Sequence, residues 1–323
     1  MASETPSFEY NFIRLDTKPS AQLSYFFLPA TVHHEPQDRL VVFVNGLGRP
    51  QTSWASTIRK LHRLRPDGLP AMLTYDRFGQ GQSLDRDPAD EGAADPAHAH
   101  DCMSAVRDMR QLIQQVTGQF MGSGNLNEIR LVLIGNSIGC ALVRLYAAEY
   151  PGTVAGVLFL DSTLTNSDFV SIIPDPDDRG KPVDTGITDD ELRKARLVLR
   201  KVFHPDVGNK EGLSRKNLNQ LLPHSHSPRL QGIGGRGPYL TVVGHDFDAF
   251  AKDSEEKLGI SQLILQTYVN PFWHDYNKGL AKLTESERSQ GPVQAPGASH
   301  FIQDDNPDFV AEKLLEIIDK SLA

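Results

Sequence analysis

The chain has 323 residues, of which 39% are hydrophobic and 23% are charged. This composition is sufficient for the core of one large domain or two ordinary ones and excludes wholesale disorder. The net charge is −8, and no cluster of lysine or arginine stands apart from acidic neighbours, which argues against a nucleic-acid or anionic-membrane surface.

The start of the chain and the cysteine content bear on the compartment. Residues 1–10 contain no basic segment followed by an apolar one, so no secretory signal is expected. No apolar run has the length of a membrane span. Cys102 and Cys140 cannot build a disulfide framework. We therefore expect a cytoplasmic protein, in a reducing compartment, with no membrane and no nucleic acid among its partners.

The N-terminal half alternates between strands and helices. Residues 8–15 and 22–28 are predicted to be two edge strands of a hairpin joined near residues 18–20. Four apolar strands follow, at residues 40–44, 71–75, 131–134 and 154–160. Three amphipathic helices are expected, near residues 54–64, 101–116 and 140–149. This alternation predicts an α/β fold, with a mostly parallel sheet flanked by helices.

The alternation stops after residue 161. Residues 162–237 contain no convincing strand, and helices are expected to start at Thr188 and near Ser214. We therefore predict a core made of residues 1–161 and 238–323, with a helical cap inserted at residues 162–237.

Strands and helices alternate again in the C-terminal part. Strands are expected at residues 239–243 and 292–295, and a helix at residues 248–258 should end at Gly259. Asn270-Pro271 and Asn306-Pro307 are each expected to open a further helix, with asparagine as the cap and proline as the first helical residue.

The most informative stretch is Gly135-Asn136-Ser137-Ile138-Gly139, between an apolar strand and an amphipathic helix. A serine on so sharp a turn has a strained backbone, and glycine is required at 135 and 139 because strand and helix pass too close for a Cβ atom. The turn exposes the Ser137 hydroxyl and leaves the Ile138 amide at a helix N-terminus, where it can face an oxyanion. Ser137 is the candidate nucleophile; the alternative is a glycine-rich turn with an incidental serine.

Four segments, in order, resemble the α/β-hydrolase superfamily over nearly the whole chain. Residues 45–48 (Asn-Gly-Leu-Gly) stand where that family has its oxyanion loop, and residues 76–83 match its Asp-x-x-Gly-x-Gly-x-Ser turn. Residues 135–139 match the nucleophile elbow, and His300, in Gly-Ala-Ser-His-Phe, matches the late histidine loop. The resemblance implies the α/β-hydrolase fold with an inserted cap.

The resemblance also implies serine-hydrolase chemistry. A serine hydroxyl needs a base within hydrogen-bond reach, and His300 is the candidate; the alternative is a surface histidine. By the same resemblance, Leu47 would supply the second oxyanion amide beside Ile138. Asn45 stands where the family usually has a histidine, which changes the support of this loop and leaves its backbone donors unaffected.

The carboxylate of the expected triad is open between three residues. Most members of the superfamily place it after the strand that here spans 239–243, at a position that in this chain is Phe247. Asp246 and Asp248 flank that position, and Asp248 also looks like a helix cap. In a minority arrangement the acid follows the preceding strand, where Asp161 stands. The sequence leaves Asp246, Asp161 and Asp248 as alternatives.

No metal and no cofactor are expected. His33-His34 and His224-Ser225-His226 are pairs without a third ligand at a suitable spacing. The glycine-rich run 232–237 follows no strand and opens no helix, so a phosphate cradle is not expected. His245, beside Asp246, is a candidate supporting residue for the site.

Together these features predict a hydrolase that cleaves an ester, lactone or related acyl bond of a small organic substrate through an acyl-enzyme. The cap and the aromatic residues between 268 and 276 predict a covered apolar pocket. The alternatives are cleavage of a C–C or aminoacyl-peptide bond on the same scaffold, and a non-catalytic protein that binds a small molecule. A serine at position 137, in place of aspartate, argues against dehalogenase or epoxide-hydrolase chemistry. The oligomeric state is not predicted.

Overall fold

The computed structural model describes residues 8–31, 38–178 and 186–321. The central sheet is built from β1 (Asn11–Leu15), β2 (Lys18–Leu28), β3 (Arg39–Val44), β4 (Ala71–Tyr75), β6 (Arg130–Asn136), β7 (Val154–Leu160), β9 (Tyr239–Gly244) and β10 (Ser289–Gln294). Its order is β1-β2-β4-β3-β6-β7-β9-β10. The pairs β1–β2 and β2–β4 are antiparallel and the other neighbours are parallel, so the expected mostly parallel sheet is confirmed.

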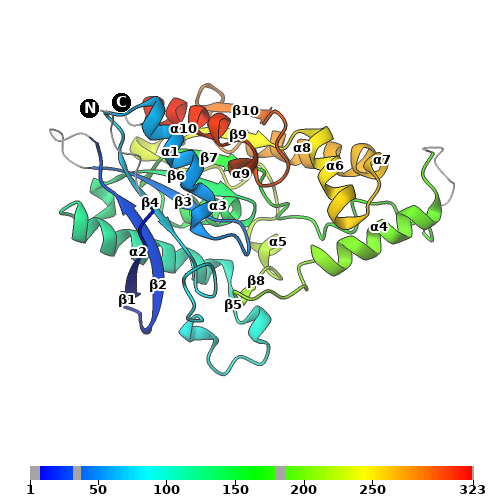
Figure 1. Ribbon diagram of the computed structural model, residues 1–323, viewed down its shortest axis with the longest axis horizontal. Helices are drawn as coiled ribbons and strands as arrows, with labels where there is room; N and C mark the ends of the chain where they lie inside the picture. The colour runs from blue at the N-terminus through cyan, green and yellow to red at the C-terminus, as the bar shows by residue number, and fades with distance from the viewer. Residues whose placement is uncertain (1–7, 32–37, 179–185, 322–323) are drawn as a thin grey trace.

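Helices cover both faces of this sheet (Figure 1). On one face, α1 (Ala55–Leu64) and α10 (Pro307–Ser321) pack against Val41 and Phe43 of β3. On the other face, α2 (Cys102–Phe120) and α3 (Ile138–Glu149) pack against Val42 of the same strand. Since successive side chains of a strand point to opposite faces, an unbroken apolar strand indicates a sheet buried on both sides. The expected flanking helices are therefore confirmed.

The N-terminal hairpin differs from its prediction in one respect. β1 and β2 pair as expected, but β2 begins at Lys18 and also pairs with β4. Of these two strands, only β1 therefore lies at an edge of the sheet. Residues 23–27 of β2 are all buried, as expected for an inner strand of a sheet whose two faces are covered.

The described part of the segment between β7 and β9 is mostly irregular and contains one long helix. Its long helix, α4 (Asp189–Val202), begins as expected after Thr188, whose hydroxyl and main-chain N–H form a reciprocal capping box with Glu191. The helix expected near Ser214 is absent there. Instead β8 (Leu213–Ser214) pairs with β5 (His100–Asp101), and the short α5 (Leu218–Leu221) follows. Pairing with β5 gives the backbone at Ser214 the hydrogen bonds that a helix would have supplied.

The helices after β9 correct a second prediction. α6 (Phe247–Leu258) ends at Gly259, which has a left-handed φ of 67°, as expected. α8 (Asn270–Leu280) begins at the expected position with Pro271 in its first turn, but Asn270 is not its cap. Asn270 itself has helical φ and ψ, because a π-helical segment, Leu265–Val269, leads without a break from α7 (Gln262–Ile264) into α8. Proline has no backbone N–H to donate to a helix, and the wider π turn before Pro271 accommodates this missing hydrogen bond.

The remaining terminal elements agree with the sequence. Asn306 caps α10 by accepting a hydrogen bond from the amide of Phe309 at 3.1 Å. A short helix, α9 (Ile302–Asp305), precedes it. Cys102 and Cys140 are free and buried. Among the described residues, no helix combines the length and apolar character needed to cross a membrane.

Candidate active site

The turn between β6 and α3 holds Ser137 in a strained conformation. Its φ is 56° and its ψ is −122°, a backbone conformation that residues other than glycine rarely adopt. A Cβ atom at Gly135 would lie 2.6 Å from the main-chain nitrogen of Cys140, and one at Gly139 would collide with the carbonyl oxygen of Val44. The requirement for glycine at these two positions is confirmed, and its physical cause is the close passage of strand and helix.

Amide groups that could bind an oxyanion lie at the same cavity as this serine. α3 begins at Ile138, so the Ile138 amide has no acceptor inside the helix and lies at the positive end of the helix dipole. Leu47, in the loop after β3, lines the cavity together with Ser137 and Ile138. This arrangement is suited to stabilising negative charge on a substrate oxygen.

The loop that carries His300 is tied to the serine turn through Asn136. The buried Nδ2 of Asn136 donates to the carbonyl oxygen of His300 at 3.0 Å and to that of Leu160 at 3.1 Å. Asn136 immediately precedes Ser137, so these bonds hold the two loops against each other. The side chains of Ser137 and His300 line one cavity.

The carboxylate that faces His300 belongs to Asp161, at the end of β7. Its Oδ2 lies 2.6 Å from His300 Nδ1, and its Oδ1 lies 2.8 Å from His245 Nδ1. Burial by itself raises the pKa of Asp161, but the charge and hydrogen bonds of both histidines outweigh it and hold that pKa well below its usual range. Asp161 is therefore ionised, and its bond to Nδ1 leaves Nε2 as the ring nitrogen of His300 that can serve a reacting group.

The other two candidate acids have different partners. Asp246 accepts hydrogen bonds from the amides of Asp248, Ala249 and Gly297, so it caps α6 and ties down the loop before His300. The cap was expected at Asp248, whose carboxylate instead accepts from Gln266 Nε2 at 2.7 Å. The helix starts one residue earlier than predicted, which makes Asp246 the residue at the capping position.

A buried ion pair that the sequence did not reveal supports the loop carrying Leu47. Arg77 and Glu211 are both buried and pair at 2.8 Å between Nε and Oε2. The guanidinium of Arg77 also donates to the carbonyl oxygens of Asn45 and Gly46, at 2.8 and 3.0 Å. Glu211 Oε1 accepts from the amide of Gly48 at 2.6 Å.

These contacts fix the direction of the Leu47 amide. The carbonyl of Gly46 and the N–H of Leu47 belong to one planar trans peptide unit and point in opposite directions. Arg77 and Gln80 both donate to that carbonyl oxygen, at 3.0 and 2.9 Å, so the Leu47 N–H points away from them. Arg77 stands in the recognisable turn 76–83. No local pattern marks Glu211, because it lies 134 residues away from Arg77 along the chain.

The cavity beside Ser137 has a volume of about 300 Å³ and is lined mainly by apolar side chains. Part of its wall comes from the segment between β7 and β9, through Phe169, Leu199 and Phe203. Trp273, from α8, lines it next to His300 and donates its indole N–H to the carbonyl oxygen of Ser162. Such a cavity can hold a small, largely apolar molecule beside the serine and histidine.

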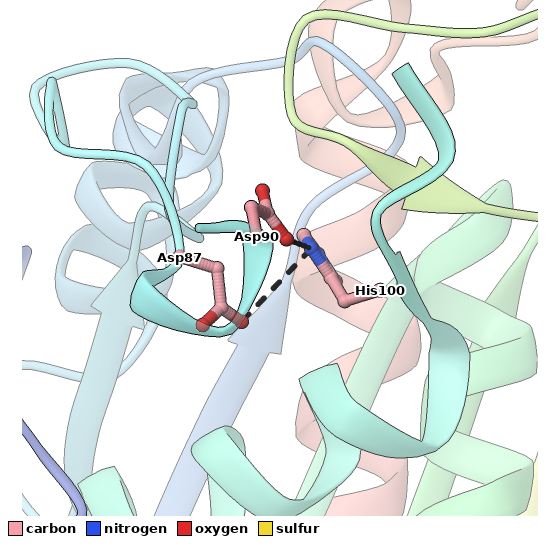
Figure 2. Close-up of side chains that lie close together, drawn as sticks. All are labelled: Asp87, Asp90 and His100. Atoms are coloured by element: carbon pink, nitrogen blue, oxygen red, sulfur yellow. Dashed lines mark hydrogen bonds and ion pairs between the residues drawn. The ribbon is translucent and has the colours of Figure 1, made fainter. Parts of the chain in front are cut away.

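Within the described residues, the side chains that could hold a metal ion are Asp87, Asp90 and His100, which point toward one another in Figure 2. Both carboxylates already have cationic partners, because Lys18 lies 2.6 Å from Asp87 and Arg86 lies 3.0 Å from Asp90. His100 hydrogen-bonds Asp90 at 2.8 Å. The side chains of this cluster are thus already engaged in ion pairs and a hydrogen bond, and we assign it no metal. His33 and His34 lie outside the described residues.

Solved structures resemble this one over almost its whole length. A thermostable carboxyl esterase from Bacillus coagulans has 13% sequence identity and a TM-score of 0.56, covering 99% of this chain and 100% of its own. A carboxylesterase structure from Nitrososphaera gargenis has 14% identity and a TM-score of 0.52, covering 97% of this chain and 99% of its own. An epoxide hydrolase from Vigna radiata has 12% identity and a TM-score of 0.56, covering 97% and 99%. At these identities the likeness shows the fold.

Sequence comparison gives the family. No curated protein sequence matched the chain. A model of the alpha/beta hydrolase family matches residues 41–313, which include the serine turn, the Asp161 strand end and the His300 loop. The chain therefore belongs to the alpha/beta hydrolase family.

Proposed function

We propose that this protein is a serine hydrolase that cleaves an ester, lactone or related acyl bond of a small organic substrate. The contact between Asp161 and His300 carries the proposal, because it orients the imidazole at the cavity that also contains Ser137. A serine on a strained turn, a histidine and a buried carboxylate are the groups that activated acyl transfer requires.

Each group then has a role in the reaction. The Ser137 hydroxyl attacks the substrate carbonyl carbon while His300 Nε2 accepts its proton. The oxyanion that forms is bound by the amides of Leu47 and Ile138. His300 returns the proton to the leaving group, which gives the acyl-enzyme, and a water molecule activated by His300 then releases the acid. Asp161 holds the imidazole in the required tautomer and stabilises its positive charge.

Residues 162–237 act in this proposal as the cap that selects the substrate. The apolar side chains Leu199, Val202 and Phe203 of this segment line the cavity that also contains Ser137. A cavity of about 300 Å³ with this lining favours an acyl compound with a short or medium apolar chain.

The test is covalent labelling by a fluorophosphonate, followed by assay of p-nitrophenyl esters. The reagent should label the wild-type protein at Ser137, and Ser137→Ala should be unlabelled and inactive. Ser254→Ala is the matched control, because Ser254 lines the same cavity without standing on the turn; this variant should keep the label. Folded wild-type protein that takes no label and turns over no acyl substrate, yet is stabilised by small ligands, would instead indicate a binding protein.

A further inference from the structure

His245 is a buried histidine next to the Asp161–His300 pair. It follows β9 and is 1% exposed. The ring of Phe250 stacks on the imidazole with a centroid distance of 4.1 Å, and Trp273 meets it edge-on at 5.4 Å. Because aromatic rings cover its faces, the ring nitrogens of His245 find their partners among protein groups at its edge.

Both ring nitrogens of His245 face hydrogen-bond acceptors. Nδ1 lies 2.8 Å from Asp161 Oδ1, and Nε2 lies 3.1 Å from Asn270 Oδ1. The orientation of the Asn270 amide is set by its surroundings. Its Nδ2 donates to the carbonyl oxygen of Phe247 at 3.1 Å and to Gln266 Oε1 at 3.3 Å, so the oxygen of the amide is the atom that faces the ring.

The orientation of Gln266 is fixed in turn. Its Nε2 donates to the carboxylate of Asp248 at 2.7 Å, which leaves Oε1 for Asn270. A carboxylate accepts and does not donate, so each amide in this chain has one possible orientation. The acceptor opposite His245 Nε2 is therefore fixed by a hydrogen-bonded chain that starts at an exposed carboxylate.

A neutral imidazole has one N–H and one lone pair, so it cannot donate to two acceptors. In the neutral ring, the nitrogen that carries the lone pair would face one of these buried oxygens. That oxygen would then lack its hydrogen bond, and the two lone pairs would repel each other. We propose that His245 is a buried imidazolium ion, the permanent positive partner of Asp161, and that it positions the Asp161 carboxylate for His300. It acts through Asp161 and is a positioning residue.

The charges around the ring agree with this assignment. Asp161 faces the ring from the end of β7, and His300 lies on the far side of that carboxylate. Asp246, at the start of α6, adds a weaker attraction. Burial lowers the pKa of His274 on α8, and the positive charge of His245 adds to that lowering. Burial lowers the pKa of His245, but the Asp161 charge and the hydrogen bonds to Asp161 and Asn270 outweigh it, so the net direction is upward.

The consequence for His300 rests on the proposed function. In an ordinary triad the histidine faces an isolated anion, which raises its pKa. Here the anion already has a cation beside it, so the field that Asp161 exerts on the His300 ring is partly offset.

The charge of His245 is measured by ¹⁵N NMR of the folded wild-type protein, with the His245→Gln spectrum used to assign the ring. We expect both ring nitrogens of His245 to show the shifts of protonated nitrogen from about pH 5 to about pH 8, where an ordinary histidine loses its proton. One ring nitrogen that is unprotonated throughout this range would overturn the proposal. This measurement needs no catalytic activity, so it stands apart from the outcome of the labelling test.

The effect on His300 is measured from the pH dependence of kcat/KM. Replacing His245 by glutamine removes the cation, so the acidic limb should move upward by about one pH unit. His274→Gln is the control, because it removes a nearby histidine that does not contact Asp161, and it should leave the limb in place. A folded His245→Gln enzyme with reduced kcat and an unshifted limb would refute the electrostatic role. Labelling that fails at Ser137 would instead refute the proposed function.

Discussion

Oδ2 of Asp161 lies 2.6 Å from Nδ1 of His300, although 139 residues separate them along the chain. The contact follows from strand order. β7 lies between β6 and β9, and the carboxyl ends of parallel strands meet at one edge of a sheet. The Asp161 amide donates to the carbonyl oxygen of Val243, at 2.8 Å, which fixes the strand end beside the loops after β9 and β10.

The candidate acids can be separated by two substitutions. Asp161→Asn should lower kcat by about a thousandfold or more, because the amide no longer stabilises the imidazolium and favours the wrong tautomer of His300. Asp246→Ala should leave kcat nearly unchanged and lower the free energy of unfolding by about 1 kcal/mol, because it removes a helix cap. Esterase kinetics and urea unfolding measure the two effects. A large loss of kcat in the Asp246 variant alone would reverse the assignment.

The support of the Leu47 loop can be tested at Glu211. Glu211→Gln should lower the free energy of unfolding by about 3 kcal/mol, because Arg77 is left as a buried charge without its partner. In the fraction that remains folded, kcat should fall by up to about 100-fold, since the Leu47 amide is less firmly oriented. The measurements are urea unfolding and kcat at low temperature.

A matched control comes from an exposed ion pair. Glu287 pairs with Arg236 at 2.8 Å on the surface, and Glu287→Gln should change the free energy of unfolding by less than about 1 kcal/mol. A Glu211 variant that is destabilised but has the wild-type kcat would mean that the ion pair serves stability alone.

The proposed role of residues 162–237 predicts a dependence on acyl-chain length. Each methylene that enters the apolar cavity should raise kcat/KM about fourfold until the cavity is filled, since burial of one methylene contributes about 0.8 kcal/mol. Val202, on α4, lines the cavity. Val202→Trp should therefore lower kcat/KM for long-chain p-nitrophenyl esters more than for the acetate.

Leu197 provides the comparison on the same helix. It is 52% exposed and contributes nothing to the lining of the cavity, so Leu197→Trp adds the same bulk outside it. Its chain-length profile should match that of the wild type. Identical profiles for the two tryptophan variants would argue against a substrate-selecting role for α4.

The raised pKa of His245 predicts how stability varies with pH. A histidine whose pKa is higher in the folded state contributes stability that is fully present below its unfolded pKa, about 6.5. That contribution is lost as the pH rises through the folded-state pKa, with a slope of up to about 1.4 kcal/mol per pH unit. The stability of the wild type should therefore fall more steeply above pH 6.5 than that of His245→Gln.

Urea unfolding of both proteins at a series of pH values measures this difference. His62→Gln is a useful control, because burial lowers the pKa of His62 and gives its contribution the opposite sign. Parallel stability curves for the wild type and His245→Gln would show that His245 has the same pKa in the folded and unfolded states.

Much of the fold could be predicted because its signals are local. The strands at 71–75 and 154–160 have the bounds that their apolar runs predicted. The helix start at Thr188 and the helix end at Gly259 were both predicted correctly, because each depends on hydrogen bonds or backbone conformation within one turn. Asn270 was wrongly predicted to be a helix cap, because the π-helical segment before it has no sequence signature of its own.

The sequence by itself determined the serine turn, since the strand and the helix that directly follows it leave no room for a Cβ atom at position 135. It left three carboxylates as partners of His300. Only the tertiary structure decided that Asp161 meets this histidine, that His245 contacts Asp161, and that Glu211 accepts from the loop carrying Leu47. These contacts join segments remote along the chain, and packing of the loops at the sheet edge sets their geometry, which no local pattern of residues records.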